Sequence, residues 1–203
     1  MNYIIKDKET FFRLNKLDNY MSGHKGFIAG GVFKNIFNDE PIRDVDIFFQ
    51  TKEDFDGGVD YFKKHKDWGK SYENNNCIAF YHKTNKISIE LVKRFFLSPQ
   101  EVIDMFDFSI VRAAYFKQEN EDGGINYKFI YVDRFFEDLH QKKLVIDIDF
   151  DKIPMPANTF DRAFKYQRYG YNLCRESKVK LIEALRAIQG EVDFNRSLYF
   201  GID

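Results

Sequence analysis

A diglycine turn followed by two closely spaced aspartates constrains the fold of this chain more than any other feature. Residues 27–29 are apolar and predict a short buried strand, which Gly30 and Gly31 follow directly. After a short predicted helix, Asp44 and Asp46 stand two residues apart in a second predicted strand. Side chains two apart on a strand point to the same face. The two carboxylates are therefore expected to share one face of a sheet.

The two halves of this feature suit different parts of a nucleotide. Without a Cβ, Gly30 and Gly31 allow the backbone to approach a phosphate closely, and N–H groups at the start of the following helix attract anions. Two adjacent carboxylates repel each other unless a cation lies between them, so Asp44 and Asp46 are candidate metal ligands. We therefore interpret the stretch as a site for nucleotidyl transfer.

Further acidic residues are candidates for a third metal ligand. In the predicted strand 87–93, Glu90 lies on the face opposite the Ile and Leu side chains, where it can meet the two aspartates. Asp107 is an alternative for that role. Acidic residues also alternate in the stretch 144–151, but they follow no diglycine turn. We interpret that stretch as an edge strand with a solvated acidic face.

Composition and charge limit the partners that this chain can attract. The formal net charge is −1, so there is no global electrostatic attraction to nucleic acid. The local basic cluster Lys63, Lys64 and Lys66 is interpreted as a solvated helix end or, alternatively, as an RNA contact. No stretch is apolar enough to predict a membrane span, and no signal peptide is recognisable.

The spacing of the cysteines and histidines predicts no metal site built from these residues. Cys77 and Cys174 lie far apart and fit no zinc or redox spacing, so we expect two reduced thiols in a cytoplasmic protein. The four histidines share no ligand spacing and are expected at the surface. The oligomeric state is not readable from the sequence.

The order of predicted elements indicates an α/β (α+β) chain with a mixed sheet flanked by helices and a short helical C-terminal extension. A helix is expected over 9–21, another over 51–68, strands over 77–82 and 87–93, and a capped helix from Ser98. Two more strands end at Val132, and helices follow over 133–143, 158–174 and 178–188. We place a domain boundary between residues 1–155, the catalytic domain, and residues 156–203, a neck-like extension packed on it.

Four motifs in this order resemble the head of the class II tRNA nucleotidyltransferase/poly(A) polymerase family, within the polymerase-β-like superfamily. The first motif is the Gly-Gly pair with twelve residues before Asp-x-Asp, although the helix between them has Lys34-Asn35 where the family has Arg-Asp. The second matches residues 107–115 but lacks the paired arginines and the asparagine, and the third is echoed at 133–139 without its glycines. The fourth is a basic row in the first neck helix at 162–168.

The resemblance implies a polymerase-β-like nucleotidyltransferase fold and a metal-dependent reaction that moves a nucleoside monophosphate from an NTP to an acceptor hydroxyl. Asp44, Asp46 and Glu90 would hold two Mg²⁺ ions, with Mn²⁺ as a substitute. The nucleotide would be bound by Gly30, Gly31, Lys34, Asp107, Arg112, Arg162, Lys165 and Arg168.

Alternatives stay open at this point. Arg112 can meet a phosphate or pair with an acid, and the basic row of residues 162–168 can be a solvated helix face. The acceptor implied by the resemblance is an RNA 3′ end. A protein or small-molecule hydroxyl, and an inactive nucleotide-binding module, are the alternatives.

Overall fold

An eight-stranded mixed sheet lies at the centre of the structure, a computed structural model that describes residues 2–189. The strand order is β1-β8-β7-β2-β3-β6-β5-β4. Neighbours pair antiparallel except β3 and β6, which are parallel. The strands are β1 (Tyr3–Asp7), β2 (Phe27–Ala29), β3 (Asp44–Phe49), β4 (Trp68–Glu73), β5 (Cys77–His82), β6 (Ser88–Phe95), β7 (Ala113–Glu119) and β8 (Ile125–Val132).

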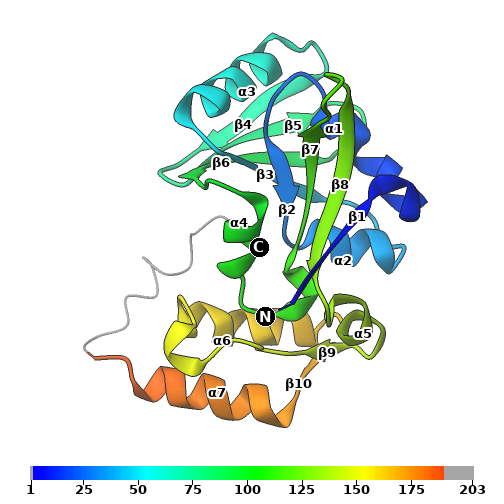
Figure 1. The fold of residues 1–203 in the computed structure, drawn as a ribbon. Helices are drawn as coiled ribbons and strands as arrows, with labels where there is room; N and C mark the ends of the chain where they lie inside the picture. Colours follow the sequence, from blue (N-terminus) through cyan, green and yellow to red (C-terminus); the bar gives the residue numbers. More distant parts are fainter. Residues whose placement is uncertain (1, 190–203) are drawn as a thin grey trace.

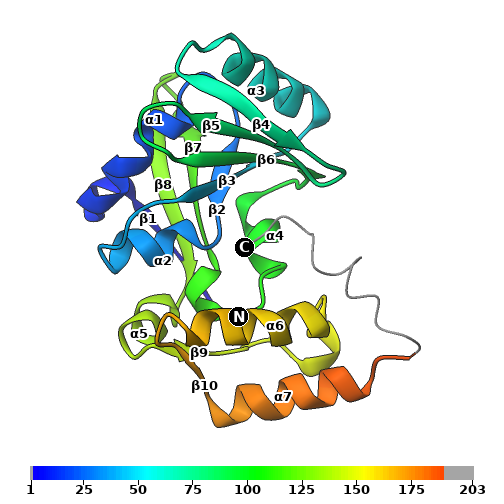
Figure 2. The same cartoon turned by 180° about the vertical axis from the view of Figure 1, so that it is seen from behind.

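Helices surround the sheet and also form a second layer beside it. Figure 1 and the reverse view in Figure 2 show α6 and α7 running side by side in this second layer, with α5 at one end of the layer. Helix α4 lies between this layer and the sheet. The helices are α1 (Asp18–Met21), α2 (Val32–Phe37), α3 (Lys52–Lys64), α4 (Pro99–Asp104), α5 (Phe135–His140), α6 (Pro156–Gln167) and α7 (Arg175–Arg186). Short 3-10 helices are η1 (Lys8–Thr10), η2 (Phe12–Leu17), η3 (Ser109–Val111) and η4 (Phe150–Lys152). A two-stranded parallel sheet joins β9 (Lys143–Leu144) to β10 (Asn172–Leu173).

Helix α3 covers one face of the β3 half of the sheet. It begins at the N-cap Thr51, whose side chain accepts a hydrogen bond from the Asp54 backbone N–H. Phe55 of α3 packs against Phe49 of β3 with ring centroids 5.6 Å apart. Since strand side chains alternate, β3 presents its acidic residues on the face away from α3.

The predicted mixed α/β fold is confirmed, and its strands 77–82, 88–95 and 125–132 lie close to their expected positions. The expected single helix over 9–21 is wrong, because the segment divides into η1, η2 and α1. Strands β1 and β4 were not expected from the pattern. The tail after Gly190 lies outside the described residues.

The predicted acidic edge strand at 144–151 is also wrong. Beyond β9 the segment forms no strand and enters η4 at Phe150. Ile146 donates its backbone N–H to Ser177 Oγ at 2.8 Å, and its carbonyl accepts from Lys180 Nζ at 3.0 Å. The alternation therefore arises from packing against α7 and not from strand pairing. The segment ahead of the expected 155/156 boundary thus belongs with the helical layer, and the boundary itself stays a prediction.

No helix within residues 2–189 is long and apolar enough to cross a membrane. Both cysteines are free thiols: Cys77 is buried and Cys174 is partly exposed.

A candidate nucleotide and metal site on the acidic face of the sheet

The parallel pairing of β3 and β6 brings two predicted site residues side by side. Asp46 stands opposite Glu90 and Asp44 opposite Ser88 in the register of the two strands. Paired residues on adjacent strands point to the same face at a strand spacing of about 4.8 Å. Asp46 is buried, while Asp44 is exposed at the start of β3. The acidic face expected from the alternation of β3 and β6 therefore exists, with Asp46 and Glu90 as neighbours.

Gly30 faces Asp46 across the same site. Its φ is +97°, a conformation that side chains disfavour, and its N–H donates to the Ala113 carbonyl at 3.1 Å. A Cβ placed on Gly30 would lie 3.5 Å from Phe106 and 3.7 Å from Asp46 Oδ2. A side chain at this position would therefore be in van der Waals contact with the carboxylate and with the Phe106 ring. Gly31 follows as the N-cap of α2.

Two protein donors hold the carboxylate of Glu90. The Tyr72 hydroxyl donates a hydrogen bond to Oε1, and Cys77 Sγ lies 3.5 Å from Oε2. Burial and the neighbouring Glu90 carboxylate raise the pKa of Tyr72, and the same two causes raise the pKa of Cys77 to about 12. Both groups are therefore protonated donors at neutral pH.

The acidic residues offer oxygen ligands only, the kind that Mg²⁺ prefers. Among residues 2–189 no three His, Cys, Asp or Glu side chains are gathered closely enough to hold a metal ion. The chemistry of the oxygen donors and the lack of a side chain at Gly30 beside Asp46 fit a divalent cation, whereas the carboxylates share a face without converging on one point. Like charges favour such separation unless a cation lies among them.

On the helical side, Arg162 of α6 meets Asp107, with Nε 3.4 Å from Oδ2. Both side chains are largely buried, and Asp107 Oδ1 also accepts from the Phe108 N–H at 2.8 Å. Lys165 lies on the same side of α6 by helical periodicity, but Arg168 is an exposed residue that caps the helix. The structure therefore joins two of the predicted nucleotide residues and separates Arg168 from them.

Arg112 is not placed to bind a nucleotide. Its side chain is fully buried, and its guanidinium donates to Asp147, to Asp104 at 3.0 Å and to the Ile103 carbonyl at 2.9 Å. The acid-pairing alternative is therefore the one that the structure contains. The sequence pattern missed it because Asp147 was assigned to a solvated strand face.

Lys34 is likewise engaged in packing. It is buried at 5% exposure, forms an ion pair with Glu40, and lies 5.1 Å from the centre of the Tyr169 ring. These contacts join α2 to the end of α6. Its amine is thus directed at the helical layer, and we withdraw its assignment to the nucleotide.

The basic cluster of residues 63–66 lies at the end of α3, which packs on the face of the sheet away from Asp46. Lys63, Lys64 and Lys66 are exposed, and Lys64 pairs with Asp60 at 3.8 Å. The cluster therefore takes no part in the acidic site.

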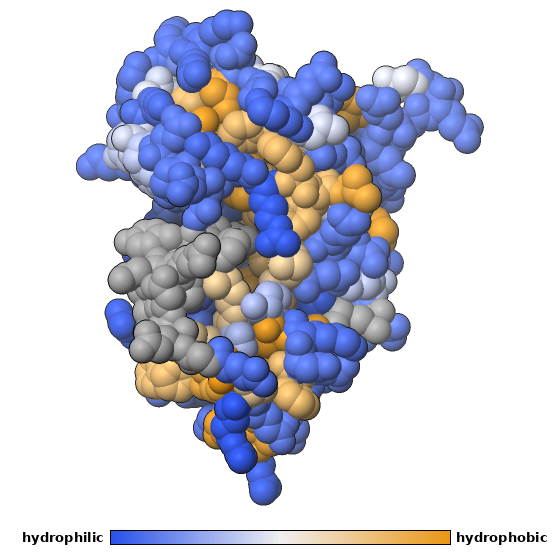
Figure 3. Space-filling view, turned by 90° about the vertical axis from the view of Figure 1, so that its left-hand side faces the viewer, coloured by the Kyte–Doolittle hydropathy of each residue, from blue (hydrophilic) through white to orange (hydrophobic). Residues whose placement is uncertain are grey.

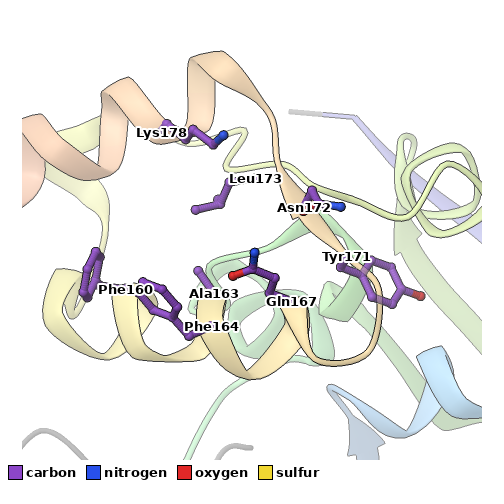
Figure 4. Close-up of a pocket in the computed structure, with 8 residues that line it drawn as sticks. All are labelled: Phe160, Ala163, Phe164, Gln167, Tyr171, Asn172, Leu173 and Lys178. Atoms are coloured by element: carbon purple, nitrogen blue, oxygen red, sulfur yellow. The ribbon is translucent and has the colours of Figure 1, made fainter.

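A separate pocket lies between α6, β10 and α7 in the helical layer, with a volume of about 220 Å³ (Figure 4). Its lining includes Phe160 and Phe164 of α6, whose rings pack edge to face at 5.0 Å. By helical periodicity these residues lie on the side of α6 opposite Arg162. Figure 3 shows that apolar surface also runs down one side of the molecule between hydrophilic regions. None of the residues that line the pocket is a predicted site residue.

His24 contradicts the expectation that the histidines lie at the surface. It is buried, with Nε2 2.8 Å from the Tyr20 carbonyl and Nδ1 accepting the Gly26 N–H at 3.0 Å. Burial, and to a smaller extent Lys117, lower its pKa to about 4. His24 is therefore a neutral core residue, and no spacing signal in the sequence marks it.

Solved structures with the same arrangement define the class of fold. A CCA-adding enzyme in complex with CTP matches with a TM-score of 0.68 and 14% identity over 92% of this chain and 46% of that chain. The Thermotoga maritima CCA-adding enzyme complexed with tRNA matches with a TM-score of 0.63 and 13% identity over 92% and 46% of the two chains. A tRNA nucleotidyltransferase complexed with a primer tRNA and an incoming ATP analogue matches with a TM-score of 0.59 and 18% identity over 85% and 50%.

The protein therefore has a polymerase-β-like nucleotidyltransferase fold, as the motifs predicted. The sequence model of the Gabija anti-defense 2 family matches residues 4–142, and the chain belongs to that family. No curated protein matches the sequence. The chain spans about half the length of the CCA-adding enzymes that it resembles.

Proposed function

We propose that this protein is a divalent-metal-dependent nucleotidyltransferase that moves a nucleoside monophosphate from an NTP to an acceptor hydroxyl. The observation that carries the proposal is the contact set around Asp46. Its carboxylate faces the side-chain-free position of Gly30, and its strand pairs in register with Glu90. Space for a phosphate beside a pair of carboxylates is what this reaction requires.

Asp44, Asp46 and Glu90 would hold the metal, as two Mg²⁺ ions or Mn²⁺ in their place. Bound Mg²⁺ would supply neutralisation of the triphosphate and a lower pKa at the acceptor hydroxyl. The residues present provide only oxygen atoms, in keeping with the ligands of that ion. Metal dependence is part of the proposal, and removal of divalent cations tests it.

The chain positions the nucleotide through backbone and basic groups. The backbone at Gly30 and Gly31 would approach the phosphates where no Cβ intervenes. Arg162 and Lys165, on the α6 side that faces Asp107, would contact the triphosphate or the base from the helical layer. Orientation by these groups, with water displaced from the site, would contribute most of the rate.

The acceptor that we propose is an RNA 3′ end. It is supported by the similarity to enzymes solved with tRNA. A protein or small-molecule hydroxyl is the second candidate, and the formal net charge of −1, which provides no global attraction to nucleic acid, favours it. The family description names an anti-defense role against Gabija and no reaction.

Incubation with each α-labelled NTP and Mg²⁺, together with cellular RNA or cellular protein, tests the proposal and separates the acceptors. We expect label on RNA, and label on protein would support the second candidate. Thermal melting with each NTP, with and without Mg²⁺, provides an independent readout. Metal-independent stabilisation without any labelled product would instead indicate an inactive nucleotide-binding module.

A further inference from the structure

Glu90 is held by a side-chain cluster that reaches it from two other strands. Tyr72 extends from β4 to Oε1, and Cys77 extends from β5 to Oε2. The two groups are also in contact with each other, with Cys77 Sγ 3.8 Å from the Tyr72 hydroxyl oxygen. Both oxygens of one carboxylate therefore have a donor from the chain itself.

A β-bulge in β4 places Tyr72 on the acidic face. Lys70 stands opposite Phe80, but Tyr72 stands opposite Ala79, so Ser71 is an extra residue in the pairing. Phe80 belongs to the face covered by α3, where its ring lies 5.5 Å from Phe62. With regular pairing and no bulge, Ser71 would stand opposite Ala79, and strand alternation would turn Tyr72 toward that covered face. Bulges often redirect a side chain beside a functional site.

Strand β5, which lies between β4 and β6, leaves room for the ring of Tyr72. In the register of β5, Ala79 pairs with Glu90 on one side and with Tyr72 on the other. A residue this small allows the phenol to pass over β5 and reach the next strand. Tyr72 is 42% exposed, so its ring contributes little to the core. The contact with Glu90 accounts for its position better than hydrophobic burial does.

A carboxylate held at both oxygens keeps some of its acceptor capacity. An ionised carboxylate has about four lone-pair sites, and the Tyr72 and Cys77 contacts use two of them. Residues that hydrogen-bond to a ligating carboxylate orient it and tune its affinity for the metal. The two contacts thus restrain the orientation of the Glu90 carboxylate.

We propose that Tyr72 and Cys77 are positioning residues that orient the Glu90 carboxylate toward a divalent cation shared with Asp46. This inference rests on the proposed function, because it takes Glu90 to be a metal ligand. Tyr72 acts as the main donor, and Cys77 restrains the second oxygen through a longer contact.

The test is the affinity for Mn²⁺ alone, measured on the full chain by electron paramagnetic resonance of the free ion. We expect Tyr72→Phe, which keeps the ring, to weaken Mn²⁺ binding by about 10-fold or more. Tyr81→Phe is the matched control, because Tyr81 of β5 is similarly exposed at 39%. It should bind Mn²⁺ as the unsubstituted protein does, and Glu90→Gln should bind it at least as weakly as Tyr72→Phe.

Cys77 provides a second variant pair. Cys77→Ser retains a donor and should preserve most of the affinity, whereas Cys77→Ala should weaken it. Labelled-nucleotide transfer by Tyr72→Phe should recover when the Mg²⁺ concentration is raised, which a folding defect would not allow.

The outcomes separate the two claims. Unchanged or tighter Mn²⁺ binding by Tyr72→Phe, with weakened binding by Glu90→Gln, overturns the positioning role and leaves the proposed function standing. If the unsubstituted protein itself binds no Mn²⁺, the metal-dependent function fails, and the positioning role fails with it.

Discussion

Arg162 Nε lies 3.4 Å from Asp107 Oδ2, and this ion pair joins α6 to the segment that leads into η3. Both side chains are largely buried, at 15% and 8% exposure, so solvent screens the pair less than it screens a surface pair. The contact is one of the links between the helical layer and the sheet side of the molecule.

A double-mutant cycle on this pair is the first prediction. Asp107→Ala and Arg162→Ala should each lower the free energy of unfolding, and together they should cost less than the sum, with a coupling energy of about 1 kcal/mol. Urea denaturation of the four proteins measures the cycle. Additive effects would mean that the two side chains do not interact.

Loss of Asp147 should destabilise the protein strongly. Asp147→Ala removes one of the two carboxylates that pair with the guanidinium of the fully buried Arg112 and leaves only that of Asp104. Breaking such a buried pair costs about 3 kcal/mol or more, measured as a lower urea midpoint. Asp151→Ala, at an exposed position four residues later, should leave that midpoint unchanged. Equal effects of the two variants would contradict the buried-pair assignment.

His24 should make stability dependent on pH. Its pKa is about 4 in the folded protein and about 6.5 when unfolded, so the unfolded state binds more protons between these values. The stabilisation is complete above pH 6.5 and decreases as pH falls to about 4, by roughly 3 kcal/mol in all. The measurement is the free energy of unfolding against pH.

His24→Asn removes the titrating ring, and its amide oxygen can still accept the Gly26 N–H. This variant should show a flatter pH dependence between 6.5 and 4. His140→Asn, at an exposed histidine, is the control and should keep the dependence of the unsubstituted protein. A slope that persists in His24→Asn would assign the effect to other groups.

Gly30→Ala should lower both stability and nucleotide binding. Its positive φ makes a side chain cost about 1–2 kcal/mol, and the methyl group would fill the space beside Asp46 Oδ2. Gly123→Ala is a matched control, since Gly123 has a φ of +77° and no atom within 4 Å of an added Cβ. Both variants should melt earlier, but only Gly30→Ala should lose the NTP-dependent rise in melting temperature. Retained stabilisation by NTP in Gly30→Ala would place the phosphates elsewhere.

Asp46→Asn should abolish nucleotide transfer and keep the fold. The substitution removes one buried negative charge beside Glu90 without changing the side-chain size. We expect incorporation of labelled nucleotide to fall by more than about 100-fold. Mutating a residue that only hydrogen-bonds to a metal ligand already lowers metal affinity or activity by about 10- to 100-fold. Asp149→Asn, in the helical layer, should transfer normally. Normal transfer by Asp46→Asn would refute its role as a metal ligand.

Local patterns predicted which residues share a face. Alternation in two strands placed Asp46 and Glu90 on the polar side of each, and the Gly-Gly turn marked the position of Gly30. The structure adds the parallel register of β3 and β6, which makes the two acids neighbours. The roles of these residues in metal and nucleotide binding stay predictions.

Two basic residues that the resemblance assigned to the nucleotide, Arg112 and Lys34, are buried and paired with acids. The resemblance implied nucleotide binding for Arg112 and Lys34, with pairing to an acid as the open alternative for Arg112. Each instead meets a carboxylate that is supplied from another part of the chain, Asp147 in the first case and Glu40 in the second. Arg112 and Asp147 are 35 residues apart, so their pairing depends on long-range packing that no local pattern encodes.

The sequence by itself determined the glycine turn, the acidic faces of β3 and β6, and elements such as β5, β6 and α4, because these follow from backbone conformation and the period of side chains along each element. Tertiary structure alone decided which faces meet. It placed Tyr72 on Glu90 through a bulge in β4, paired Arg112 with Asp147 and Asp104, and buried His24. These contacts join residues far apart in the chain or depend on one extra residue in a strand, so only the folded arrangement establishes them.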